Sequence, residues 1–141
     1  NVCSNAQSAK DDSIQVVNTF KKLLSICKKV DLSDTQLIKK GAFAKAAKYF
    51  IYRGDDKKRA WREFSNYNNV EDRKNIDKAC FRINGTINKD STYKIIKYFT
   101  KTESEGRWHA ITVSYKKNGK DKEALFAFLK IGSRFALGDI D

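Results

Sequence analysis

The sequence lacks most of the residue patterns by which catalytic and metal sites are recognised. It has a single histidine, His109, and no serine in a nucleophile-elbow motif, so a hydrolase triad has no complete set of members. It has no glycine-rich phosphate loop, and its three cysteines show no C-x-x-C spacing. One histidine and scattered cysteines give weak support for a metal site, which needs several ligands brought together. We therefore expect a non-catalytic domain with no catalytic residues, no metal and no cofactor.

No apolar run approaches the roughly 20 residues that a membrane span requires. The chain has no methionine and starts at Asn1, so we expect either a processed mature form or a trimmed chain, with any targeting segment lost from view. Residues 6–8 have the small-x-small form that signal peptidase prefers, and Cys3 is an alternative first residue carrying a lipid anchor. We predict an exported protein, periplasmic, cell-surface or secreted, with a flexible segment at 1–12 and one domain at 13–141.

An odd number of cysteines leaves at least one unpaired. In an oxidising compartment, Cys27 and Cys80 are the pair to test for a disulfide, with Cys3 left over. The alternative is that both are buried thiols acting as small hydrophobic side chains.

The net charge of +12 suggests a nucleic-acid partner. The basic residues are nearly always interleaved with acids, however, and the densest basic run, Lys57-Lys58-Arg59, directly follows Asp55-Asp56. Such a pattern is more typical of a solvated surface, so nucleic acid is the disfavoured partner.

Helical spacing dominates the first half of the chain. Apolar residues from Ile14 to Cys27 recur every three or four positions behind the capping residues 11–13, which predicts a helix at 13–29. Gly41 divides a short helical turn from a helix at 42–52, and Gly54 is placed for its C′ residue. Two further helices are predicted at 57–68 and 70–83. The last stops at Asn84-Gly85, a turn dipeptide that also begins a glycosylation sequon with Thr86.

The second half alternates with the period of two that is typical of strands. It predicts a meander of four antiparallel strands at 92–102, 107–116, 122–131 and 134–140, with hairpin turns at Asn118-Gly119 and Gly132-Ser133. His109 shares a strand face with Ile111 and Val113, so we expect a packed histidine. The fold class is therefore α+β, with N-terminal helices packed on a curved four-stranded antiparallel meander. Both faces of the middle strands are partly apolar, so the face away from the helices needs a cover, a partner or a ligand.

Two local stretches carry a family resemblance. Residues 40–47 (KGAFAKAA) look like the Gly-acid-Phe-x-x-Ala helix start of exported bacterial members of the nuclear-transport-factor-two-like superfamily, which includes ketosteroid-isomerase and SnoaL-like proteins. Residues 129–139 (LKIGSRFALGD) look like the closing hairpin of those proteins. Ala42 stands where an acid is usual, and Phe135 where tryptophan is common. The resemblance implies a cone-like sheet wrapped around a helix, with an apolar pocket inside.

An isomerase of this kind needs a carboxylate base inside the cone and a donor such as a tyrosine. No acid is clearly placed there, which favours binding over catalysis. The aromatic residues are the candidates for lining the pocket, and the surrounding lysines favour a small apolar or anionic ligand. The alternative is a homodimer formed through the sheet face. The pocket candidates are Trp61, Phe64, Tyr67, Tyr98, Trp108, Phe126 and Phe128.

Overall fold

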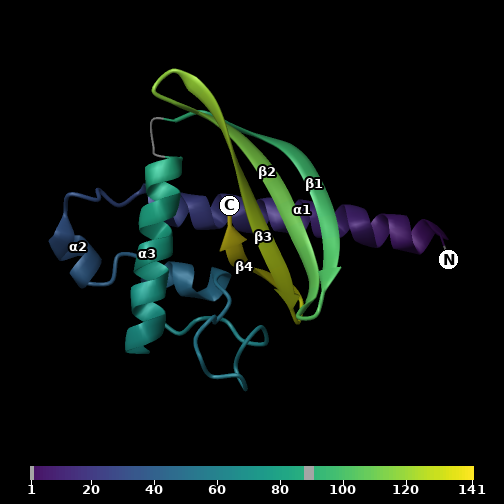
Figure 1. The fold of residues 1–141 in the computed structure, drawn as a ribbon, viewed down its shortest axis with the longest axis horizontal. Coiled ribbons are helices and arrows are strands. Elements are labelled where there is room, and N and C mark those ends of the chain that lie inside the picture. The colour runs from purple at the N-terminus through teal and green to yellow at the C-terminus, as the bar shows by residue number, and fades with distance from the viewer. Residues whose placement is uncertain (1, 88–90) are drawn as a thin grey trace.

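The computed structural model describes the backbone of residues 2–87 and 91–141, and the side chains from residue 9 onward within those ranges. Helices come first and a single sheet follows, as the sequence predicts (Figure 1). The sheet is an antiparallel meander in the order β1-β2-β3-β4, and it is curled rather than closed. The α+β class is therefore confirmed. The elements are α1 (Val2–Lys28), α2 (Thr35–Lys39), the 3₁₀ helix η1 (Ala44–Tyr49), α3 (Val70–Thr86), β1 (Tyr93–Glu103), β2 (Gly106–Lys117), β3 (Lys120–Ile131) and β4 (Arg134–Ile140).

The strands lie close to their predicted positions because their turns are fixed by local chemistry. Asn118 and Gly119 connect β2 to β3 with φ angles of 54° and 76°, a left-handed pair that matches the twist of antiparallel strands. The predicted alternation of β1 is wrong beyond Ile95, where a bulge shifts the register. The extra residue turns Ile96 outward, 49% exposed, and brings Tyr98 opposite Ile111.

Helix α1 begins at Val2, so the predicted start at residue 13 is wrong. The preceding residues include no glycine or proline that would break a helix, and Asp11 and Asp12 lie inside it instead of capping it. The side chains of Cys3 and of residues 6–8, named above for lipid attachment and signal cleavage, lie outside the described side chains.

Helix α1 crosses the curled sheet and closes its inner face (Figure 1). Ile14 was predicted to point inward but is 50% exposed, and the buried stripe includes Val16, Phe20 and Leu23. The Phe20 ring lies 4.9 Å from that of Phe126, between centroids. The main core is therefore the layer between α1 and the inner sheet face.

The segment between α2 and α3 differs most from the prediction. The predicted helix at 42–52 is a short 3₁₀ helix, and the predicted helix at 57–68 is a series of turns. Phe50 and Ile51 are extended, and the Ile51 N–H donates to the Leu137 carbonyl at 3.0 Å. Pairing with the edge of β4 thus overrides the local helical spacing, because it satisfies backbone groups that a helix would have used internally. Gly54 has no left-handed φ, so it is not a helix-ending C′ residue.

Helix α3 continues to Thr86, so the predicted turn at Asn84-Gly85 is wrong. The helix starts at the N-cap residue Asn69, whose side-chain oxygen accepts from the Asp72 N–H at 3.0 Å. Asn84 is only 8% exposed and is used in packing, which takes its amide away from glycosylation in the folded chain.

Candidate binding cleft

The predicted pocket aromatics do not gather around one cavity. Phe126 and Phe128 are fully buried in the core under α1, with Phe20 and Phe135 beside them. These side chains fill the inside of the curled sheet, the place where the resemblance implies a pocket.

Tyr98 also lies on this inner face, where it pairs with His109. The Tyr98 hydroxyl is 2.8 Å from His109 Nδ1, and the His109 ring meets the Phe135 ring edge-on with centroids 4.9 Å apart. Burial lowers the pKa of His109 and raises the pKa of Tyr98, so both are favoured in their neutral forms. At 4% exposure, His109 is a packed residue, as its strand position predicts.

Trp61, Phe64 and Trp108 form a second cluster on the outer face of the sheet. They pack around Ile51, Leu129 and Ala136, with the two indole rings edge-on at 5.6 Å between centroids. The loop that carries Trp61 and Phe64 therefore covers part of the outer apolar face of the sheet. The sequence predicts that this face needs a cover, a partner or a ligand, and the loop is such a cover. Trp61 has a φ of 66°, a conformation that is strained for a bulky residue.

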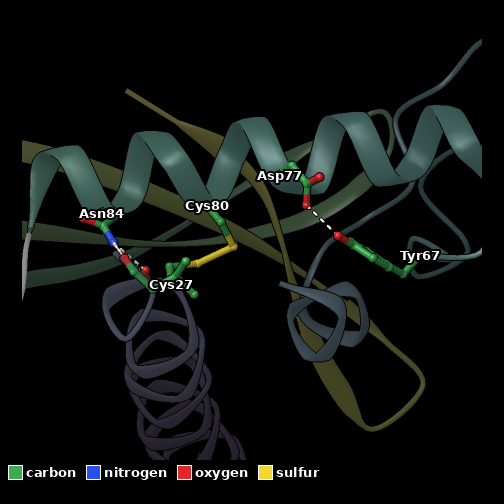
Figure 2. The surroundings of a disulfide bond; sticks show 6 residues. Cys27, Tyr67, Asp77, Cys80 and Asn84 are labelled. Atoms are coloured by element: carbon green, nitrogen blue, oxygen red, sulfur yellow. Dashed lines mark hydrogen bonds between the residues drawn. A yellow bond between two sulfur atoms is a disulfide. The ribbon is translucent and has the colours of Figure 1, made fainter. Parts of the chain in front are cut away.

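Cys27 and Cys80 are joined in a disulfide that ties the end of α1 to the middle of α3, with 5.0 Å between the Cα atoms (Figure 2). One turn further along α3, the Asn84 amide nitrogen donates to the carbonyls of Cys27 and Val30 at 2.7 and 2.9 Å. Carbonyls at the end of a helix have no partner within it, so Asn84 satisfies groups that would otherwise be buried unpaired. The α1–α3 seam, formed by Cys27, Val30, Cys80 and Asn84, is closed both covalently and by hydrogen bonds.

Tyr67, the remaining pocket candidate, packs against the first half of α3. Its hydroxyl donates to an Asp77 carboxylate oxygen at 2.9 Å (Figure 2). Burial, followed by the bond to Asp77, raises the pKa of Tyr67 to about 12. Burial also raises the pKa of Asp77, against the opposing effect of this bond. Tyr67 thus anchors the preceding loop to α3.

A cleft of about 390 Å³ lies between α3, the end of β4 and the extended segment 50–53. We call it the α3–β4 cleft. One stripe of α3 forms a side of it, because residues 72, 75, 76, 79 and 82 recur at helical spacing. Its lining residues are Phe50, Ile51, Tyr52, Arg53, Ser65, Asp72, Asn75, Ile76, Lys78, Ala79, Arg82, Leu137, Gly138, Asp139 and Ile140.

The rim of the cleft carries three cations. Arg53 donates to the Gly138 carbonyl and lies 3.9 Å from an Asp139 carboxylate oxygen. Lys78 and Arg82 are exposed, and neither forms an ion pair with any residue in the described part of the chain. Two positive charges are therefore available next to the apolar wall of the cleft.

The most unusual group in the cleft is Asp72, which is only 2% exposed. Its Oδ2 accepts from Arg59 Nη2 at 2.9 Å and from the Asn66 N–H at 2.8 Å. The hydrogen bond to Asp72 is the main cause that raises the pKa of Arg59 above its ordinary value. The other oxygen of Asp72, Oδ1, has no hydrogen-bond partner in the part of the chain that the structure describes.

Sequence reasoning missed this cleft. The sequence places no acid clearly inside the cone, whereas the acid of the cleft, Asp72, is on helix α3. A signal was present, since Asp72 precedes Ile76 and Ala79 at helical spacing and so falls on the buried stripe of α3. The contribution of β4 could not be read from such spacing.

Over the described residues, no group of three or more His, Cys, Asp or Glu side chains is arranged to hold a metal ion. Within the same residues, no helix combines the length and the apolar character that crossing a membrane requires. Comparisons with models of protein families, with curated proteins and with solved structures found no match.

Proposed function

We propose that this domain is a non-catalytic binding protein that holds a small anionic amphiphile in the α3–β4 cleft. The observation that carries the proposal is the placement of two cations, Lys78 and Arg82, beside an apolar wall in one cleft, neither with an ion pair among the described residues.

The apolar wall provides the affinity for a hydrocarbon body. Ile76 and Ala79 from α3 face Leu137 and Ile140 from β4 across the cleft. The volume of about 390 Å³ is at the small end of the range for ligand pockets, which suits a single short chain or a small ring system.

The cations provide selectivity for an acid group. Lys78 and Arg82 lie on α3 at the rim, where a carboxylate or phosphate head could meet both while its chain enters the cleft. The net charge of +12 adds a general attraction for anions that salt weakens.

Export and family are parts of the same proposal. A disulfide between Cys27 and Cys80 is typical of an oxidising compartment and so supports export to the periplasm, the cell surface or the medium. The order of helices followed by a curled four-stranded meander supports a relationship to the nuclear-transport-factor-two-like superfamily. Within that relationship, the ligand is proposed at the side of the sheet, since core side chains fill its inside.

Calorimetric titration with decanoate and with decylamine tests this function, because the two share a chain and differ in the sign of the head group. We expect decanoate to bind and decylamine to bind much more weakly. Changing both Lys78 and Arg82 to glutamine should weaken decanoate binding by roughly tenfold.

The matched control changes Lys57 and Lys74 to glutamine, which removes the same charge from exposed positions outside the cleft. If both double variants lose the same amount of decanoate affinity, the effect comes from general electrostatics and the proposed site is wrong. Equal binding of decanoate and decylamine would overturn the anionic specificity.

A further inference from the structure

The α3–β4 cleft contains a polar atom that the folded chain leaves unsatisfied. Asp72 is 2% exposed, and its Oδ1 has no donor among the described residues. Buried polar atoms nearly always have a partner, and leaving one without a partner costs free energy. Asp72 also lines the cleft, so a molecule bound there can supply the missing donor once the side chains that cover Oδ1 shift.

We propose that the ligand is an amphiphilic hydroxy acid whose hydroxyl group donates to Asp72 Oδ1 while its acid group meets Arg82. This inference rests on the proposed function and specifies the ligand class for the same cleft.

The two polar contacts lie at opposite ends of one helical stripe. Asp72 and Arg82 are ten residues apart on α3, which corresponds to about 15 Å along the helix axis. Ile76 and Ala79 lie between them on the same side. A ligand that reaches both ends therefore has its hydroxyl and acid groups separated by an apolar chain.

The charges around Asp72 favour a neutral donor over an ammonium group. Arg59 and the Asn66 N–H already bind Oδ2, so the Asp72 charge has a cationic partner. Arg53, Lys78 and Arg82 line the same cleft. A ligand ammonium would meet repulsion from these cations, whereas a hydroxyl donates a hydrogen bond without adding charge.

A second polar group is available to the same hydroxyl. Asn75 is exposed, lies one turn beyond Asp72 on α3 and also lines the cleft. Its amide can donate to the hydroxyl oxygen while the hydroxyl proton is directed to Asp72.

The test compares three probes of one chain length: ω-hydroxydecanoate, decanoate and ω-aminodecanoate. Titration calorimetry of the wild-type protein should give a dissociation constant for ω-hydroxydecanoate roughly tenfold below that for decanoate. The amino analogue should bind more weakly than the hydroxy acid. This comparison needs no variant, so it does not depend on any variant folding.

Two variants then identify the carboxylate. In the Asp72→Asn variant, the ratio of the affinity for ω-hydroxydecanoate to the affinity for decanoate should be close to one. Asp77→Asn, on the same helix but outside the cleft, should leave the ratio unchanged. Circular dichroism checks that both are folded. If Asp72→Asn does not fold, the wild-type probe comparison decides.

The outcomes distinguish a failure of this inference from a failure of the proposed function, the binding of an anionic amphiphile in the α3–β4 cleft. If decanoate and ω-hydroxydecanoate bind equally well, the role of Asp72 is overturned while the anionic cleft stands. If ω-aminodecanoate binds more tightly than ω-hydroxydecanoate, the proposal that a neutral group donates to Asp72 is wrong. If none of the probes binds, the proposed function itself fails.

Discussion

Helix α3 has two sides that differ in how completely their polar groups are satisfied. On the side facing α1, Cys80 is bonded covalently to Cys27 and Asn84 donates to two carbonyls. On the side facing β4, within the described residues, one oxygen of Asp72 has no hydrogen-bond partner, and Lys78 and Arg82 have no ion pair. Both sides belong to one helix, so the difference separates the groups that stabilise the fold from the groups that the proposed function uses for binding.

Under the proposed function, one side of α3 contributes to stability and the other side to recognition. A helix held on one side by a bridge and a buried amide can present a fixed stripe of groups on its other side. The seam should therefore be sensitive to substitution in unfolding experiments, and the exposed side chains at the cleft, such as Lys78 and Arg82, should be tolerant.

The largest effect is expected from removing the disulfide. Cys27→Ser with Cys80→Ser opens a loop with a sequence separation of 53, and we expect the free energy of unfolding to fall by roughly 2–4 kcal/mol. Urea denaturation measures the loss. Reduction of the wild-type protein should have a similar effect, and Cys3→Ser, which leaves the bridge intact, is the control. An unchanged denaturation midpoint in the double variant would show that the seam does not depend on its bridge.

A smaller loss is expected from Asn84→Ala. This change leaves the Cys27 and Val30 carbonyls without their donor, and we expect a loss of about 2 kcal/mol in the free energy of unfolding. Asn75→Ala is the matched control, because Asn75 is exposed on the cleft side of the same helix. Equal losses in the two variants would abolish the distinction between the two sides.

The smallest effect is expected from the cleft cations. Lys78→Gln with Arg82→Gln should change the free energy of unfolding by less than about 0.5 kcal/mol, because both side chains are exposed and neither has an ionic partner among the described residues. Thermal and urea denaturation together check this value. A loss as large as that of Asn84→Ala would mean that these cations stabilise the fold.

The sequence predicts the sheet half well and the middle of the chain poorly, for a physical reason. The turns at Asn118-Gly119 and Gly132-Ser133 are local, so alternation and turn chemistry are enough to place the strands. The bulge in β1 and the register shift between Ala127 and Phe128 in β3 were not predicted, since regular alternation does not reveal an extra residue. Segment 42–68 follows contacts with a strand that is far away in sequence, and helical spacing says nothing about such contacts.

The candidate site could be predicted only in part. Asp72 and Arg82 share a helical stripe that can be read from spacing, but their common cleft depends on β4 and on the extended segment 50–53. The pairing of Cys27 with Cys80 was one of two alternatives, because spacing alone does not determine which thiols meet. The aromatic character of a residue does not indicate whether it lies in the filled core, as Phe128 does, or in the outer cluster, as Trp61 does.

The bulge in β1 also has a consequence for the edges of the sheet. β1 is an edge strand, and irregular pairing together with exposed lysines at positions 94, 97 and 101 hinders the docking of another strand. At the opposite edge, Ile51 and Arg53 already bind the Leu137 and Gly138 carbonyls of β4. Both edges are thus protected against strand addition, which guards an open sheet from growing into aggregates.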